Sequence, residues 1–217
     1  MVIFDEFHER SIHTDLSLAL CLQVQELLRP DLKLLIMSAT LDSLELTNLL
    51  GKIPVISSKG KIYDVENIYL ETNIKQPDSK SINTLLLNIT LKSIKEDEGD
   101  ILVFLAGSRE IQKLQALREE ALKDKNIEIL PLYSTLSKEK QDKAISKSSK
   151  RKIILSTNIA QTSLTIEGVK VVIDSGLEKI SQYNYSNGMN HLELSFISND
   201  SAIQRAGRAG RLSNGKC

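Results

Sequence analysis

Two adjacent carboxylates stand directly after the first apolar run of the chain. Asp5 and Glu6 follow "MVIF", and His8 comes two residues later. A carboxylate at the end of a central strand can hold Mg²⁺ through water, and its neighbour can orient and deprotonate an attacking water. The pair alone is a weak signal, because an acidic pair at a helix N-terminus, favoured by the helix dipole, has the same sequence. Ser38 and Thr40 follow the next apolar run and could bond a neighbouring loop or a ligand.

Three arginines recur at every third position near the end of the sequence. Arg205, Arg208 and Arg211 lie in "IQRAGRAGRL", residues 203–212. If this segment is helical, Arg208 and Arg211 share one face. Closely spaced guanidinium groups suit anionic oxygens, and one that reaches a γ-phosphate from a second domain is an arginine finger. The segment alone predicts a basic RNA-binding helix without a catalytic role equally well.

Two glycines interrupt this arginine segment. Gly207 and Gly210 would each cost a helix about 1 kcal/mol relative to alanine. We therefore expect them to permit a close approach between backbones.

Short runs of Val, Ile and Leu must position these groups. Each run stops at a small or polar residue, and helical patterns lie between the runs. Strands that are apolar on both faces and alternate with helices predict an α/β fold, with parallel sheets flanked by helices. The ligands of such sheets bind at the carboxyl ends of the strands. The six runs are "VIFD", "LKLLIMSAT", "ILVFLAGS", "IEILPLYS", "KIILSTN" and "VKVVIDSG".

Two stretches have clear helical spacing. Residues 14–29 carry an apolar stripe that includes Leu16, Leu20 and Val24, and residues 108–123 carry a second one that includes Ile111 and Leu114. A segment with one proline and two glycines, "GKIPVISSKGK", separates two groups of elements. We therefore expect part of a first domain at 1–58, a linker at 59–66 and a complete second domain at 67–217.

The composition is that of an ordinary globular protein. Lys and Arg together number 28, as do Asp and Glu, so a nucleic-acid or membrane site would have to be a local patch. The basic cluster "KSSKRK" at 147–152 is interpreted as a solvated loop. Cys21 and Cys217 have no metal-ligand spacing, and no apolar run approaches the roughly 20 residues that span a bilayer. These features favour a reducing, cytoplasmic location.

Taken in order, the motifs resemble the DEAH-type helicases of superfamily 2, RNA helicases with RecA-like domains, and most of all the bacterial HrpB group. "FDEFHERS" resembles the family's motif II and "MSATLD" its motif III. "ILVFLAGSREI" is similar to motif IV, residues 157–168 to motif V, and "QRAGRAGR" to motif VI. The stretch 172–198 resembles the strand and β-hairpin that these proteins place between motifs V and VI. The resemblance covers essentially the whole chain.

The resemblance implies ATP and Mg²⁺ as cofactors, single-stranded nucleic acid, with RNA expected, as partner, and the bacterial cytoplasm as location. Asp5 would bind Mg²⁺ and Glu6 would polarise the hydrolytic water, while His8 would connect the ATP site to Ser38 and Thr40, which couple hydrolysis to domain movement. Arg205 would be structural, and the hairpin near 177–196 would guide or separate a strand. The other implied sites are Gln204, Arg208 and Arg211 at the γ-phosphate, Ser163 and Glu167 facing the nucleotide, and Ser108, Arg109, Thr157 and Asn158 at the nucleic acid.

The sequence departs from the family pattern in two residues and one motif. Gln161 stands where Glu is usual, and Glu167 replaces a common Asp. The phosphate-binding pattern G-x-x-x-x-G-K-[ST] is absent. We therefore expect a fragment of an ATP-dependent helicase that is inactive alone. The alternative is a non-catalytic nucleic-acid-binding module with a RecA-like fold.

Overall fold

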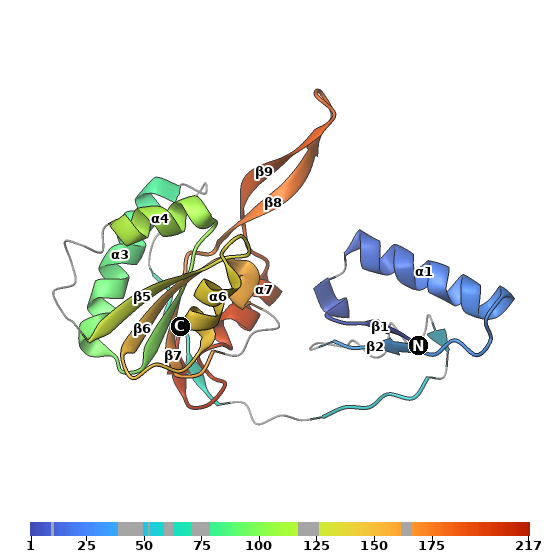
Figure 1. Cartoon of the computed structure of the whole chain (residues 1–217), viewed down its shortest axis with the longest axis horizontal. Coiled ribbons are helices and arrows are strands. Elements are labelled where there is room, and N and C mark those ends of the chain that lie inside the picture. Colours follow the sequence, from blue (N-terminus) through green and yellow to red (C-terminus); the bar gives the residue numbers. More distant parts are fainter. Residues whose placement is uncertain are drawn as a thin grey trace. The chain divides into compact units, whose positions relative to one another are not determined.

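The structure is a computed structural model that describes residues 1–9, 11–38, 50–51, 53–58, 63–70, 79–116, 126–161 and 166–217. Two of the expected site residues, Thr40 and Ser163, lie outside these ranges. The chain divides into two compact units, Met1–Gly60 and Lys61–Cys217 (Figure 1). The boundary falls within the expected 59–66 linker.

The first unit contains a pair of parallel strands and one long helix. Strand β1 (Val2–Phe4) pairs with β2 (Leu34–Ile36), and the short 3₁₀ helix η1 (Phe7–Glu9) and helix α1 (Ile12–Leu27) connect them. The hydroxyl of Ser11 caps α1 by accepting a hydrogen bond from the backbone N–H of His13, at 3.3 Å. A small core of Phe4, Phe7 and Leu18 holds the helix on the strands.

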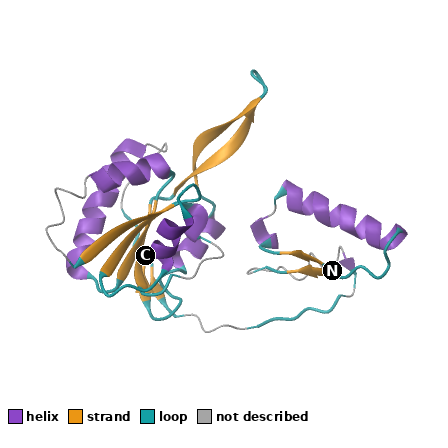
Figure 2. Cartoon of the chain, in the orientation of Figure 1, coloured by secondary structure: helices purple, strands orange, loops and turns teal. Residues whose placement is uncertain are grey.

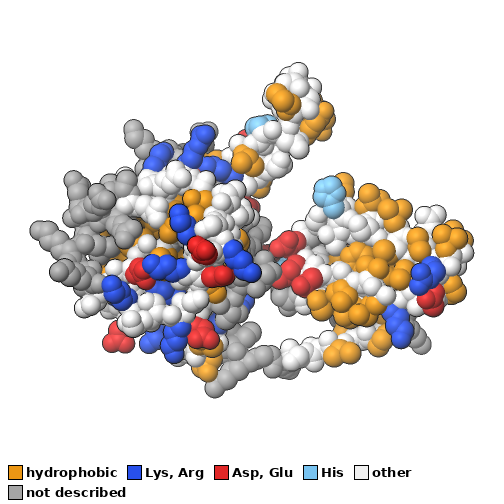
Figure 3. Space-filling model, in the orientation of Figure 1, with side chains coloured by type: hydrophobic (Ala, Val, Ile, Leu, Met, Phe, Trp, Pro, Cys, Tyr) orange, Lys and Arg blue, Asp and Glu red, His pale blue; other side chains and the backbone are white. Residues whose placement is uncertain are grey.

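Helix α1 is confirmed, but the apolar stripe noted in the sequence is not its packed face. Leu18 is buried, and Cys21 and Leu22 pack beside it, so the positions i, i+3 and i+4 from Leu18 face the strands. Leu16, Leu20, Val24 and Leu27 are exposed, and hydrophobic side chains gather over this unit's surface in Figure 3. The sequence did not identify the packed face because α1 is apolar around much of its circumference.

The second unit contains a six-stranded parallel sheet with the strand order β3-β10-β7-β4-β6-β5, flanked by helices. The sheet confirms the predicted α/β class (Figure 2). Its strands are β3 (Val65–Glu66), β4 (Asp100–Phe104), β5 (Ile127–Leu132), β6 (Arg151–Ser156), β7 (Val169–Asp174) and β10 (Gly215–Lys216). The helices among its described residues are α3 (Ser79–Glu96), α4 (Ser108–Ala116), α6 (Lys138–Ile145), the 3₁₀ helix η2 (Asn158–Ala160) and α7 (Asn199–Ala206).

The central strand β4 shows why its apolar run is continuous. Ile101 and Val103 enter a core cluster with residues of α3 and α4, including Ile111 and Leu114 as the sequence predicts. The alternate residues Leu102 and Phe104 enter a second cluster, which contains Ala144 of α6 and Ala160 of η2. Because successive side chains of a strand point to opposite faces, a strand covered by helices on both sides must be apolar throughout.

The edge of this sheet explains the glycine at position 210. A Cβ atom on Gly210 would lie 2.7 Å from the carbonyl oxygen of Tyr63 and 2.7 Å from a methyl group of Val65. The backbone N–H of Tyr63 donates to the carbonyl of Gly210, at 3.2 Å. The expected close backbone approach is confirmed for Gly210. Strand β3, which makes this approach, lies within the residues assigned to the linker.

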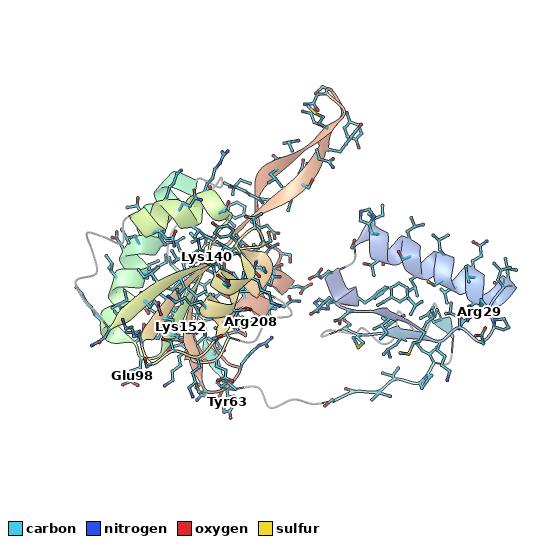
Figure 4. All side chains as sticks on the ribbon, in the orientation of Figure 1. Arg29, Tyr63, Glu98, Lys140, Lys152 and Arg208 are labelled. Atoms are coloured by element: carbon cyan, nitrogen blue, oxygen red, sulfur yellow. The ribbon has the colours of Figure 1, made fainter. Side chains whose placement is uncertain are left out.

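The interpretation of "KSSKRK" as a solvated loop is wrong for its last two residues. Lys152 is fully buried, and its ammonium group donates to the carbonyls of Ala144 and Ser146 at the end of α6. Arg151 donates to the carbonyls of Ile94 and Gly99, around the end of α3. Cations at helix C-termini satisfy free carbonyls and complement the helix dipole. These side chains therefore serve the fold, and Figure 4 shows Lys152 among the strands.

An antiparallel hairpin projects from the second unit (Figure 1). Strands β8 (Leu177–Asn184) and β9 (Met189–Phe196) pair along their whole length, which confirms the hairpin expected near 177–196. In the described part of the chain, no helix has the length and apolar character required to cross a membrane.

Candidate nucleotide and nucleic-acid site

The acidic pair lies in a tight, strained turn at the end of β1. Glu6 has a φ of 50°, the one positive φ among the described non-glycine residues. Its backbone N–H donates to a carboxylate oxygen of Asp5 at 2.9 Å, and its carbonyl accepts the N–H of Glu9 at 3.0 Å. Left-handed conformations are costly for residues with a side chain and are concentrated at functional sites. The left-handed conformation of Glu6 is therefore consistent with a functional requirement that both carboxylates lie at the end of β1.

A chain of polar contacts connects the acidic pair to the end of the neighbouring strand. Nε2 of His8 lies 3.5 Å from a carboxylate oxygen of Glu6, and Nδ1 of the same ring lies 3.3 Å from the hydroxyl of Ser38. Phe7, between Glu6 and His8 in the sequence, is buried with Phe4 and Leu18, and its backbone N–H donates to the carbonyl of Met37 at 3.0 Å. The structure thus brings together three of the expected site residues, Glu6, His8 and Ser38.

The carboxylates fit only part of a magnesium-nucleotide site. No cluster of three side chains able to ligate a metal occurs in the described segments. Mg²⁺ commonly binds one or two carboxylates and fills its other positions with water and substrate phosphates, so the exposed Asp5 is a suitable ligand. A phosphate cradle of the G-x-x-x-x-G-K-[ST] type is not in the sequence.

The arginine segment is helical only in its first part. Helix α7 ends at Ala206, and Arg208 and Arg211 lie in the turns that follow it. The backbone N–H of Arg208 donates to the carbonyl of Arg205, three residues back, at 3.1 Å. Arg208 is buried and Arg211 is exposed, so the shared helical face considered from the sequence does not form. The glycines at 207 and 210 explain why a regular helix stops here.

Arg205 is buried in the interior of the second unit, with 1% of its surface exposed. Its guanidinium donates to a carboxylate oxygen of Asp174 at 3.0 Å and lies 4.9 Å from the centre of the Phe104 ring. A buried arginine needs such a paired and hydrogen-bonded environment. These surroundings suit the structural role expected for Arg205.

Gln161 connects the segment after β6 to the arginine segment. Its side-chain carbonyl accepts a hydrogen bond from Nε of Arg205 at 3.0 Å. Its amino group donates to the hydroxyl of Ser201 at 3.0 Å and to the side-chain carbonyl of Gln204 at 3.3 Å. The guanidinium of Arg208, labelled in Figure 4, donates to the backbone carbonyl of Gln161. Through Gln161 the structure therefore brings Gln204 and Arg208 together.

The expected nucleic-acid residues follow two adjacent strands. Ser108 and Arg109 begin α4 after β4, while Thr157 and Asn158 follow β6, which pairs with β4. Parallel pairing puts both groups at the carboxyl edge of the sheet. Glu167 is exposed in the turn before β7, so it lies at the opposite, amino edge and is not brought together with these residues.

Sequence reasoning missed an ion pair at this carboxyl edge. Glu110 follows Arg109 on α4, and its carboxylate lies 2.8 Å from the ammonium group of Lys179 on β8. No spacing in the sequence connects two residues that are 69 positions apart. The one hint in the sequence is that Glu110 precedes Ile111, a member of the predicted apolar stripe. The structure shows that Glu110 is buried, and a buried carboxylate needs a partner.

The comparisons with known proteins agree with the fold and the motifs. The model of the helicase conserved C-terminal domain matches residues 80–213, which is more than half of the chain. The chain is 42% identical over 217 residues to the ATP-dependent RNA helicase HrpB of Escherichia coli, and 40% identical over 221 residues to HrpA of the same organism. These matches cover 99% and 100% of this chain.

A crystal structure of the Escherichia coli DEAH/RHA helicase HrpB superimposes with a TM-score of 0.85 over 99% of this chain, at 42% identity. The chain spans 26% of the length of HrpB and 16% of HrpA. The family match, the sequence identity and the common fold lead to one conclusion. The chain belongs to the family of the helicase conserved C-terminal domain, and within it to the DEAH/RHA helicases.

Proposed function

We propose that this chain carries part of the motor of an ATP-dependent RNA helicase, which couples hydrolysis of Mg-ATP to movement along single-stranded RNA in the bacterial cytoplasm. The observation that carries the proposal is the contact chain from Glu6 through His8 to Ser38. A carboxylate that orients a water must itself be held in place, here by the ring of His8. Because the same ring contacts the hydroxyl of Ser38, a movement of the Glu6 carboxylate can be transmitted to the end of β2. The relatives named above are ATP-dependent RNA helicases.

The roles proposed for single residues follow from their chemistry. Asp5 holds Mg²⁺, Glu6 orients the attacking water, and Gln204, Arg208 and Arg211 supply donors to the γ-phosphate. Ser163 and Glu167 are proposed to face the nucleotide, and Ser38 and Thr40 to couple hydrolysis to domain movement. Nucleic-acid phosphates are contacted by Ser108, Arg109, Thr157 and Asn158. When bound, the Mg²⁺ ion would neutralise phosphate charge.

The domain assignment is also a proposal. Residues 1–58 would be part of a first RecA-like domain, 59–66 the linker and 67–217 the second RecA-like domain. Strand β3, Val65–Glu66, pairs with β10 of the second unit, although its residues belong to the proposed linker.

ATP hydrolysis by two proteins tests the proposed function. The first is the purified chain, in which we expect negligible magnesium-dependent hydrolysis with or without single-stranded RNA, because the phosphate-binding pattern is absent. The second is HrpB of Escherichia coli in which the matching segment is replaced by residues 1–217. We expect RNA-stimulated hydrolysis by this hybrid and its loss in Glu6→Gln.

The arginines give the hybrid a second, independent readout. Arg211→Ala should lower kcat about a thousandfold or more, while RNA binding without nucleotide is retained. An equal loss of RNA binding would reassign Arg211 to RNA. A folded hybrid that binds RNA but hydrolyses no ATP would contradict the proposal and favour a non-catalytic nucleic-acid-binding module. If the purified chain hydrolyses ATP and Glu6→Gln abolishes this hydrolysis, the expected inactivity of the chain is refuted.

A further inference from the structure

The hairpin contacts the rest of its unit only near its root, among the residues that the structure describes. Leu177, at the start of β8, is buried in the core, and Leu194 of β9 packs against the same cluster. Exposure then rises along the hairpin, and Tyr185 in the terminal turn is 92% exposed. An isolated two-stranded hairpin is at best marginally stable in water, so its contacts with the rest of the unit hold it in place. The contacts at the root must therefore determine the direction in which it projects.

One of these root contacts is an ion pair with a helix of the main body. The ammonium group of Lys179 donates to the carboxylate of Glu110 at 2.8 Å, and the Glu110 side chain is only 8% exposed. Glu110 lies in the first turn of α4, where the helix dipole favours a carboxylate. Helix α4 is itself anchored, because Ile111 and Leu114 are buried in the core. The ion pair thus joins the hairpin to a fixed element.

The turn between β4 and α4 is shaped around this ion pair. A Cβ atom on Gly107 would lie 2.8 Å from the ammonium nitrogen of Lys179 and 3.0 Å from a carboxylate oxygen of Glu110. A larger residue at 107 would therefore have to displace the pair. The space left by Gly107 allows both charged groups to meet over the turn.

The opposite face of β8 is fixed as well. Because neighbouring residues of a strand point to opposite faces, Glu178 points away from Lys179. A carboxylate oxygen of Glu178 lies 3.9 Å from the guanidinium of Arg205, which also donates to the carbonyl of Leu177 at 3.4 Å. The hairpin root is therefore held between α7 on one face and α4 on the other.

We propose that Glu110 and Lys179 are positioning residues that set the direction of the hairpin relative to α4. The contacts of Arg205 hold the start of β8, and the ion pair fixes the tilt of the strand beyond that point. The consequence for nucleic acid depends on the proposed function. If that function holds, Ser108 and Arg109, which precede Glu110 on α4, move together with the hairpin as one rigid body along a bound strand.

A distance measurement in the chain itself tests the positioning role. Spin labels are attached at Gln112→Cys on α4 and Asn190→Cys on β9, with Cys21→Ser and Cys217→Ala in the background. Pulsed electron paramagnetic resonance then gives the distribution of distances between the labels. We expect a single narrow distribution for the parent and its loss in Lys179→Met. Lys179→Arg, which keeps the charge and the donors, should retain the narrow distribution.

The same distance measurement on a variant that lacks a different, exposed ion pair serves as the control. Lys92→Met removes an exposed ion pair with Glu96 and should leave the distribution unchanged. If Lys179→Met fails to fold, Glu110→Leu, which removes the acceptor and suits the buried position, takes its place with the same expected loss. A narrow, unshifted distribution in a folded variant without the ion pair would overturn the proposal. The measurement needs no nucleotide or RNA, so its outcome is separate from that of the hydrolysis assay.

Discussion

The side-chain amide of Gln161 uses both its carbonyl and its amino group to connect two motifs. It accepts from Arg205 and donates to Ser201 and Gln204. The glutamate usual at this position could accept from Arg205 but could not donate to the carbonyl of Gln204. The departure from the family pattern noted in the sequence is therefore accommodated by an amide–amide contact.

Removal of this amide should destabilise the second unit. In Gln161→Leu the buried Arg205 loses an acceptor, and we expect the free energy of unfolding to fall by about 1–3 kcal/mol. Urea denaturation followed by circular dichroism measures the change. Gln112→Leu, an exposed glutamine of α4, is the matched control and should change stability by less than about 0.5 kcal/mol. Equal stability of both variants would contradict a role for the amide.

The thiol of Cys217 should be protected from alkylation in the folded chain. Burial, with a smaller contribution from the charge of Asp174, raises its pKa to about 12 from an ordinary value of 9.0. Only the thiolate reacts with iodoacetamide, so at about pH 8 the native chain should react at Cys217 far more slowly than the chain in guanidinium chloride. Mass spectrometry of the alkylated peptide compares the two rates, and equal rates would contradict the raised pKa.

The same shift has a consequence for stability. When the pKa of a group is higher in the folded chain than in the unfolded chain, its protonated form favours the folded state. This contribution to the free energy of unfolding is complete below the unfolded pKa and is lost as the pH rises toward the folded pKa. Relative to Cys217→Ala, the chain should therefore lose stability between pH 9.0 and about 12.

At the scale of elements, the approach of β3 to the arginine segment depends on Gly210. Gly210→Ala would place a methyl group 2.7 Å from the Tyr63 carbonyl oxygen, and we expect a loss of about 1–3 kcal/mol in the free energy of unfolding. Gly207→Ala is the matched control, because its Cβ would meet no atom closer than 3.3 Å. Urea denaturation compares the two variants. A larger loss in Gly207→Ala would show that helix geometry, and not the edge strand, requires these glycines.

The elements themselves follow from local patterns, whereas their contacts do not. Strands β4 to β7 of the main sheet were predicted, because continuous apolar runs are required of strands with helices on both faces. The two-residue strands β3 and β10 were not predicted, because they are too short to show such a run. The packed face of α1 was not identified, because a helix that is apolar around much of its circumference contains several possible stripes. The last two residues of "KSSKRK" were misassigned because lysine and arginine prefer solvent, and only the fold brings free helix carbonyls to Arg151 and Lys152.

At the scale of the whole molecule, the two units differ in how completely they are packed. The two core clusters of the second unit enclose both faces of its sheet. In the described part of the first unit, the buried core residues are Phe4, Phe7 and Leu18, and helix α1 exposes several leucines. Each unit contains some of the expected site residues. The sequence could predict these residues from ordered motifs, but not the contacts that they make within their own unit.

Residues 61–217 should therefore fold without residues 1–60. We expect the shorter chain to unfold in one cooperative urea transition with the same midpoint as the second unit in the full chain. Residues 1–60 alone should show no cooperative transition, because a unit of about 60 residues buries a small share of its surface and its described part has a small core. Because the chain contains no tryptophan, circular dichroism and amide hydrogen exchange are used to follow the unfolding of both shorter chains. Loss of cooperative unfolding in 61–217 would show that the first unit contributes to the second core.

The left-handed backbone of Glu6 has a consequence for attempts to engineer this chain. Glycine adopts that conformation without penalty, whereas glutamate pays about 1 kcal/mol or more to remain in it. A selection for heat resistance would therefore reward Glu6→Gly and discard the carboxylate proposed to orient water. Variant libraries ranked by thermal tolerance alone would drift away from activity at this position, so a hydrolysis screen in the hybrid helicase should accompany them.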